Sequence, residues 1–109
     1  MSSKPDQKRY DKLRLIGCIA CRRQGRYSQI DVHHLVDKGT RKHSGGNKAT
    51  LPLCPWHHRG ETCDGWLCGS MYLIFGPSLA LHKREFKKRY GTERELLAEV
   101  DELIEDITT

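Results

Sequence analysis

Residues 51–58 read Leu-Pro-Leu-Cys-Pro-Trp-His-His, and this stretch predicts the start of a helix that carries metal ligands. Pro55 fits the first turn of a helix, because its missing N–H would have no partner at that position. Cys54 and His57 lie three positions apart across that turn, and a thiolate and an imidazole so spaced can bind one metal ion. The stretch therefore predicts half of a metal site.

Cys18-Ile-Ala-Cys21 supplies the other half, and 32 residues separate it from Cys54. Two such pairs complete a closed four-ligand site whose sulfur and nitrogen donors suit Zn²⁺. We expect this structural zinc to tie the N-terminal segment to the central helix and to contribute directly to folding. The alternative, buried free cysteines with a surface histidine, is disfavoured by two pairs at this spacing. The spacing leaves open whether His57 or His58 is the fourth ligand.

The size and composition of the chain also favour a metal. It has 109 residues, of which 37% are hydrophobic and 30% are charged, so we expect one domain with a thin core that needs disulfides or a metal. The cysteines number five, an odd count that argues against a complete disulfide framework. We see neither an apolar signal segment nor a run long enough to span a membrane. These features predict a cytoplasmic protein whose cysteines bind metal, with no membrane partner and no small-molecule cofactor.

Cys63 and Cys68 fall outside the two pairs. They would either add a second metal site or be inert small hydrophobic side chains, and we favour the second interpretation.

Charge is distributed unevenly along the chain. Residues 1–90 carry 18 Lys and Arg against 7 Asp and Glu, whereas residues 91–109 carry 1 against 7. A basic body with an acidic end fits a polyanionic partner, although basic side chains also serve to solubilise a small domain.

Periodicity and capping residues predict the other elements. Residues 5–15 form a short amphipathic helix with Tyr10, Leu13 and Ile16 on one side, ended by Gly17. Residues 28–34 alternate as a strand does, and residues 37–48 are a polar loop.

Ser78 is expected to cap a helix that runs to Tyr90 and carries Leu79, His82 and Phe86 on one stripe. Thr92 and Glu95 form a capping box for the last helix, whose helically spaced apolar residues are Leu96, Leu97, Val100, Leu103, Ile104 and Ile107.

The order of histidines resembles the HNH endonuclease motif: Val32-His33-His34-Leu35, then Asn47, then Cys54-Pro55-Trp56-His57-His58. The resemblance implies an α+β fold with a small zinc-stabilised ββα-metal core, treble-clef-like, flanked by N- and C-terminal helices. Residues 1–109 would then be a single HNH nuclease domain. Residues 1–15 would form a basic N-terminal helix or arm, residues 16–60 the zinc knuckle and HNH core, and residues 61–109 the C-terminal loop and helices.

By the same resemblance, His34 is the general base and Asn47 orients it. A histidine near its ordinary pKa can take a proton from water at neutral pH. His33 and His58 would hold the catalytic ion, Mg²⁺ or Mn²⁺ with Zn²⁺ as an alternative, which stabilises the leaving oxygen. His57 and His58 lie about 100° apart on a helix, which favours His57 for the structural zinc and His58 for the catalytic ion.

Two positions stay open at this point. Asn47 lies slightly farther from the last histidine than is most common in HNH motifs, so His43 is a possible substitute. His82 is either a core histidine, which we favour, or a third ligand of the catalytic ion.

The words Cys-Ile-Ala-Cys (18–21), Val-His-His-Leu (32–35) and 51–58 look like the Ref family of phage and prophage recombination enhancement proteins, which are RecA-dependent nucleases. This resemblance implies a DNA substrate, a role in recombination in the bacterial cytoplasm, and cutting directed by a RecA filament. The expected DNA contacts are the basic residues of the knuckle and the active-site loop: Arg22, Arg23, Arg26, Lys38, Arg41, Lys42 and Lys48.

Two other classes of function remain possible on the sequence. A non-catalytic zinc module that binds nucleic acid would need the four zinc ligands but not His34. A structural protein would use the apolar stripe between Leu96 and Ile107 as a dimer surface.

Overall fold

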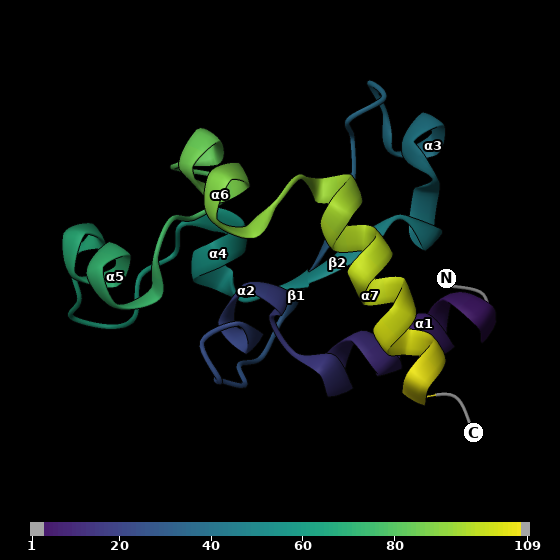
Figure 1. The fold of residues 1–109 in the computed structure, drawn as a ribbon, viewed down its shortest axis with the longest axis horizontal. Helices are drawn as coiled ribbons and strands as arrows, with labels where there is room; N and C mark the ends of the chain where they lie inside the picture. Colours follow the sequence, from purple (N-terminus) through teal and green to yellow (C-terminus); the bar gives the residue numbers. More distant parts are fainter. Residues whose placement is uncertain (1–3, 108–109) are drawn as a thin grey trace.

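The computed structural model describes residues 4–107, in which helices surround one short antiparallel hairpin (Figure 1). The first helix, α1, spans Lys4–Ile16 and buries Leu13 and Ile16, as its periodicity predicts. Gly17 ends it with a φ of 77°, and a Cβ added there would lie 2.8 Å from the Tyr27 ring. A residue with a side chain is therefore disfavoured at position 17 for two reasons: the positive φ, and the close approach of the Tyr27 ring.

The hairpin pairs β1, Asp31–His34, with β2, Thr50–Leu53. In its register His33 faces Leu51 and His34 faces Thr50. The predicted strand at 28–34 thus begins three residues late, at Asp31, because pairing with β2 extends over four residues. Every residue of β2 is buried, so the hairpin forms the centre of the fold.

The expectation of an irregular polar loop at 37–48 is wrong in part. The segment contains α3, Arg41–Ser44, and a 3₁₀ turn, η1, at Gly46–Lys48. Thr40 starts α3, since its hydroxyl accepts a hydrogen bond from the N–H of His43 at 3.1 Å. Gly45, with a φ of 120°, ends it. Local capping thus makes short helices within a polar sequence.

Two short helices carry the predicted metal ligands. Helix α2 spans Ile19–Arg22 and α4 spans Pro55–Arg59, with Cys18 and Cys54 at their N-caps. Pro55 occupies the first turn of α4, as predicted. Helix α4 packs on both β1 and β2, so β1, β2 and α4 form a compact ββα unit.

The C-terminal half adds α5, Cys68–Phe75, α6, Lys83–Tyr90, and α7, Glu93–Ile107. Helix α6 begins four residues later than predicted, since its N-cap is His82 and not Ser78. The N–H of Leu79 donates to the carbonyl of His57 at 2.8 Å, which ties the chain to α4 before the helix begins.

Helix α7 begins where the sequence predicts. The Thr92 N–H donates to Glu95 Oε1 at 2.9 Å, and the Glu95 N–H donates to Thr92 Oγ1 at 3.1 Å, so the capping box is confirmed. Helix α7 packs across α1 and β2 (Figure 1). Its stripe buries Leu96 and Val100 fully and Leu103, Ile104 and Ile107 in part. Most of the apolar stripe of α7 therefore packs against the rest of the same chain.

A single hydrophobic cluster joins these elements and contains Cys18, Cys21 and Cys54 along with the apolar side chains. Within residues 4–107, no helix has the length and apolar character needed to cross a membrane.

Candidate active site and metal centre

The four predicted zinc ligands come together in the interior. Ligand atoms of Cys18, Cys21, Cys54 and His57 all lie within 4.8 Å of one another, and all four residues are buried. The Sγ atoms of Cys21 and Cys54 are 3.8 Å apart. Zinc–sulfur bonds of about 2.3 Å at tetrahedral angles put two sulfurs about 3.8 Å apart. The spacing of the donors therefore fits Zn²⁺.

His57 is oriented toward this cluster by its other ring nitrogen. Its Nε2 lies 2.8 Å from the carbonyl oxygen of Phe75, an acceptor, so Nε2 carries the proton and Nδ1 the lone pair. That Nδ1 lies 3.2 Å from Cys54 Sγ and 3.4 Å from Cys18 and Cys21 Sγ. A backbone carbonyl that fixes the tautomer of a metal-binding histidine is a typical outer contact of zinc sites.

The backbone also supports the thiolate form of the cysteines. The N–H of Cys21 donates to Cys18 Sγ, and the N–H of His57 donates to Cys54 Sγ, each at 3.4 Å. Hydrogen bonds with Cys18 and Cys54 lower the pKa of the Cys21 thiol, while hydrogen bonds with Cys21 and Cys54 raise the pKa of the Cys18 thiol. A bound cation would replace the thiol protons of such a cluster.

A second site lies in an open cleft of about 530 Å³ lined by His33 and His58 together with Glu93, Lys83 and Lys87. The rings of His33 and His58 are 5.0 Å apart, centroid to centroid. His33 Nε2 lies 2.5 Å from Glu93 Oε1, and both side chains are about 15% exposed. The hydrogen bond from His33 lowers the pKa of Glu93. The cleft therefore combines two imidazoles with two carboxylates, those of Glu93 and Asp37.

His58 is held by a carboxylate from the neighbouring strand. Its Nδ1 lies 3.1 Å from Asp31 Oδ2, and Arg59 Nε donates to the same oxygen at 2.8 Å. The ionised carboxylate accepts only, so Nδ1 carries the proton and Nε2 of His58 is left with its lone pair. This arrangement leaves Nε2 suited to a metal ion or a proton.

His34 belongs to a different hydrogen-bonded chain. Its Nε2 lies 3.0 Å from Asn47 Oδ1, while Asn47 Nδ2 donates to Asp6 Oδ2 at 3.1 Å. The carboxylate of Asp6 accepts from the amide nitrogen, which turns the amide oxygen toward His34. Nε2 of His34 must then donate, and Nδ1 retains the lone pair that a general base needs.

The predicted catalytic residues are thus joined as two pairs rather than one cluster: His33 with His58, and His34 with Asn47. His33 and His34 are adjacent at the end of β1, and their rings enter different groups of contacts because successive strand residues point in different directions. His43 does not take the place of Asn47, since its ring hydrogen-bonds to Thr40.

His82 lies away from both pairs. Its ring packs against Tyr72 and Trp56, with centroids 4.9 and 6.1 Å away, and its Nδ1 accepts from the N–H of Ser78 at 3.1 Å. Cys63 and Cys68 are exposed. In the described part of the chain, only Cys18, Cys21, Cys54 and His57 form a group with metal-site spacing.

The predicted DNA contacts are divided between free and engaged side chains. Arg23 pairs with Glu99 at 2.7 Å, and the Arg26 guanidinium lies 4.8 Å from the centre of the Phe75 ring. The remaining predicted contacts are exposed on the knuckle and the loop: Arg22, Lys38, Arg41, Lys42 and Lys48.

Several residues at or near the two sites were not predicted from the sequence. Asp31 could have been found, because it shares a strand face with His33. Lys83 and Lys87 were visible as part of a basic run. Glu93 carried no signal, since an acidic residue in the first turn of a helix is ordinary, and Asp6 lies in a different element from Asn47.

Arg94 anchors the loop between the strands to α7. Its Nε and Nη2 donate to the two Asp37 oxygens at 2.6 and 2.8 Å, and Nη2 also donates to the Ser44 carbonyl at 2.8 Å. The hydrogen bond from Arg94 lowers the pKa of Asp37. A lowered carboxyl pKa stabilises the folded state above the ordinary Asp pKa of about 3.9, and this stabilisation is lost as pH falls through the lower value.

We therefore expect Arg94→Gln to accelerate amide hydrogen exchange across residues 37–45 at neutral pH, measured by mass spectrometry. In the wild type, protection of these amides relative to their intrinsic exchange rate should fall only in acid, as Asp37 is protonated below its ordinary pKa of about 3.9. Arg84→Gln is the matched control, because Arg84 is exposed and forms no ion pair in the described residues. Unchanged exchange in Arg94→Gln would show that the anchor is dispensable.

Comparison with known proteins adds one finding. The sequence profile of a family described as "Recombination enhancement, RecA-dependent nuclease" matches residues 3–105. A search of curated proteins gave no match.

Proposed function

The chain belongs to the family of recombination enhancement, RecA-dependent nucleases, and from this we propose that it is a metal-dependent DNA endonuclease of the HNH type. The observation that carries the assignment is the hydrogen-bonded chain from Asp6 through Asn47 to His34, which leaves a lone pair on His34 Nδ1. A non-catalytic zinc module has no need for a histidine oriented in this way.

The ββα unit would be the HNH core, with Zn²⁺ bound by Cys18, Cys21, Cys54 and His57 as its structural staple. The donor spacing and the orientation of His57 support this assignment. Because the zinc would join α2 to α4, it would hold β1 and α4, and therefore His33 and His58, in place.

Hydrolysis would begin at His34. Its Nδ1 would take a proton from a water molecule, and the resulting hydroxide would attack phosphorus while the bond to the 3′-oxygen breaks. Asn47 would stabilise the protonated imidazole by keeping its oxygen on Nε2–H. Asp6 would be a positioning residue, because it holds the side-chain amide of Asn47 and would act on His34 through that amide.

His33 and His58 are the residues that would hold a divalent ion, Mg²⁺ or Mn²⁺, with Glu93 beside them. The carboxylate of Glu93 suits Mg²⁺ or Mn²⁺, whereas the two imidazoles also suit Zn²⁺, which is therefore the alternative ion. When bound, the ion would supply a Lewis acid for the phosphoryl group and the leaving oxygen. Glu93 would be a better third ligand than His82, because Glu93 lines the cleft with His33 and His58, whereas the ring of His82 packs against Tyr72 and Trp56.

Cleavage of plasmid DNA tests the proposal. Zinc-loaded protein should nick or cut a supercoiled plasmid when Mg²⁺ or Mn²⁺ is added and should leave it intact without them. Dependence on RecA is tested by comparing two substrates: duplex DNA alone, and duplex DNA paired with a single strand that is bound in a RecA filament. We expect more cleavage of the second substrate, at the paired region. Wild-type protein that binds DNA but never cuts, with either ion and with RecA, would favour the non-catalytic module.

A further inference from the structure

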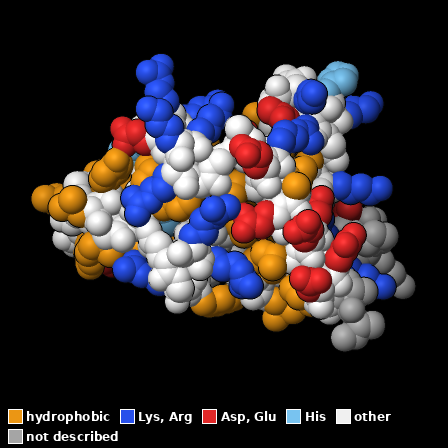
Figure 2. Space-filling view, in the orientation of Figure 1, with side chains coloured by type: hydrophobic (Ala, Val, Ile, Leu, Met, Phe, Trp, Pro, Cys, Tyr) orange, Lys and Arg blue, Asp and Glu red, His pale blue; other side chains and the backbone are white. Residues whose placement is uncertain are grey.

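Helix α6 is the most basic segment of the chain. All five Lys and Arg of residues 61–90 fall within it, at positions 83, 84, 87, 88 and 89. Every one of these side chains is exposed. Figure 2 shows basic side chains gathered over α6, whereas acidic side chains follow α7.

The charges on α6 are not neutralised within the fold. Five arginines elsewhere in the described residues form ion pairs with carboxylates, namely Arg9, Arg14, Arg23, Arg59 and Arg94. None of the five basic residues of α6 has such a partner in residues 4–107. Glu85, the acidic residue of the helix, accepts a hydrogen bond from the Tyr72 hydroxyl. The helix therefore presents unpaired positive charge to solvent.

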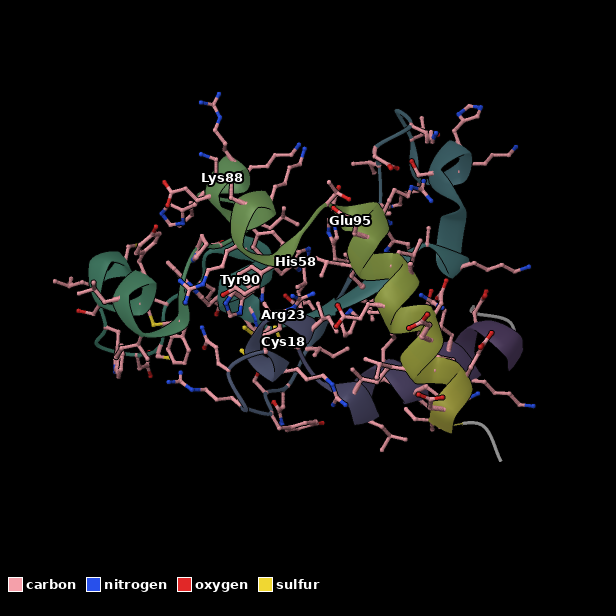
Figure 3. The ribbon with its side chains drawn as sticks, in the orientation of Figure 1. Cys18, Arg23, His58, Lys88, Tyr90 and Glu95 are labelled. Carbon is pink, nitrogen blue, oxygen red and sulfur yellow. The ribbon has the colours of Figure 1, made fainter. Side chains whose placement is uncertain are left out.

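Helical spacing sorts these residues into rows, because residues four apart lie on the same face. Phe86 and Tyr90 form the buried row. Lys83 and Lys87 form a second row that lines the cleft with His33 and His58. Arg84 and Lys88 form a third row, and Lys88 lies on the side of α6 away from His58 (Figure 3).

The carboxylates of the cleft are already engaged. Glu93 accepts from His33, and Asp37 is held by both guanidinium donors of Arg94. The charge of Lys83 also helps to lower the pKa of Glu93, without a direct ion pair. Lys83 and Lys87 are the cationic side chains that line the cleft with the histidines, and neither forms a direct ion pair within the described residues. Ammonium groups in that position would attract an anionic backbone.

We propose that Lys83 and Lys87 bind DNA phosphates next to the cleavage site, so that α6 sets the path of the strand through the cleft. The inference rests on the proposed function for its DNA substrate, and it adds contacts beyond the knuckle and the loop. The lysines act by binding and take no part in proton transfer.

Salt-dependent DNA binding tests this without cleavage. We compare zinc-loaded wild type, Lys83→Gln/Lys87→Gln and Arg84→Gln/Lys88→Gln by fluorescence anisotropy on a labelled 30-base-pair duplex, with no Mg²⁺ or Mn²⁺ added. Each phosphate contact contributes about 0.9 to the slope of log K against log salt. The cleft variant should lose about 1.8 from that slope and bind roughly 60-fold more weakly at ~0.1 M salt. The outer variant, which removes the same charge, should change the slope by less than about 0.5.

Equal slope changes in the two double variants would overturn the proposal, because general attraction to a basic helix would then explain binding. An unchanged slope in the cleft variant would also overturn it, while leaving the nuclease proposal intact if the wild type still cuts. If the wild type never cuts but the predicted slope is lost in the cleft variant only, the nuclease proposal fails, and what is retained here is binding of DNA phosphates by Lys83 and Lys87.

Discussion

Cys18→Ser protein is expected to retain no zinc and to unfold without a cooperative transition. The side chain of Cys18 is fully buried, lies 3.4 Å from His57 Nδ1 and caps α2. Structural zinc contributes about 10–16 kcal/mol in small metal-binding domains, whereas whole domains are stable by about 5–15 kcal/mol. Losing one of four ligands would therefore remove most or all of the net stability.

The measurements are zinc content after gel filtration and thermal unfolding followed by circular dichroism. Cys63→Ser is the matched control, because it makes the same substitution at an exposed cysteine outside the cluster. The control should keep one zinc per chain and the melting temperature of the wild type. A Cys18→Ser protein that also keeps its zinc and melts cooperatively would contradict the structural assignment.

His34→Ala protein should stay folded and zinc-loaded but cleave DNA about 10²–10⁴-fold more slowly. A decrease of this size in the cleavage rate is expected when the general base that accepts the proton from water is removed. His34 lies at the end of β1 and is partly exposed, and its side chain hydrogen-bonds to Asn47. Truncation should therefore leave the core undisturbed.

Single-turnover plasmid nicking with Mg²⁺ or Mn²⁺ gives the rate, and zinc content and melting temperature show whether the fold is retained. His43→Ala is the matched control, since His43 is an exposed histidine of the nearby loop whose ring contacts Thr40 instead of Asn47. The control should cut within a few-fold of the wild type. A folded His34→Ala protein that cuts as fast as the wild type would remove His34 from the mechanism.

These two predictions separate the two sites, although His57 and His58 are adjacent in sequence. His57 is buried and directed at the thiols. His58 is partly exposed, contacts the ring of His33 and hydrogen-bonds to the carboxylate of Asp31. About 100° of rotation between successive helical residues is enough to send neighbouring side chains to different places. The structural and catalytic halves therefore share one short helix, and a substitution at either histidine should be tested for both zinc content and cleavage.

The features of this protein that could be predicted from its residues alone are local ones. The pairs at 18–21 and 54–57 carry their ligand spacing within one turn each, and Thr92 with Glu95 carries a complete cap. Pro55 and Gly17 specify a helix start and a helix end through their own backbone preferences. Such features depend on residues three or four apart, so they can be read before any packing is known.

The tertiary structure alone decided how the site is completed. Glu93 meets His33 across 60 residues, and Asp6 meets Asn47 across 41. Both contacts exist because α7 and α1 pack against the hairpin, and no local pattern encodes that packing. The same is true of Lys83 and Lys87, whose row on α6 turns toward the cleft because Phe86 and Tyr90 are drawn into the core.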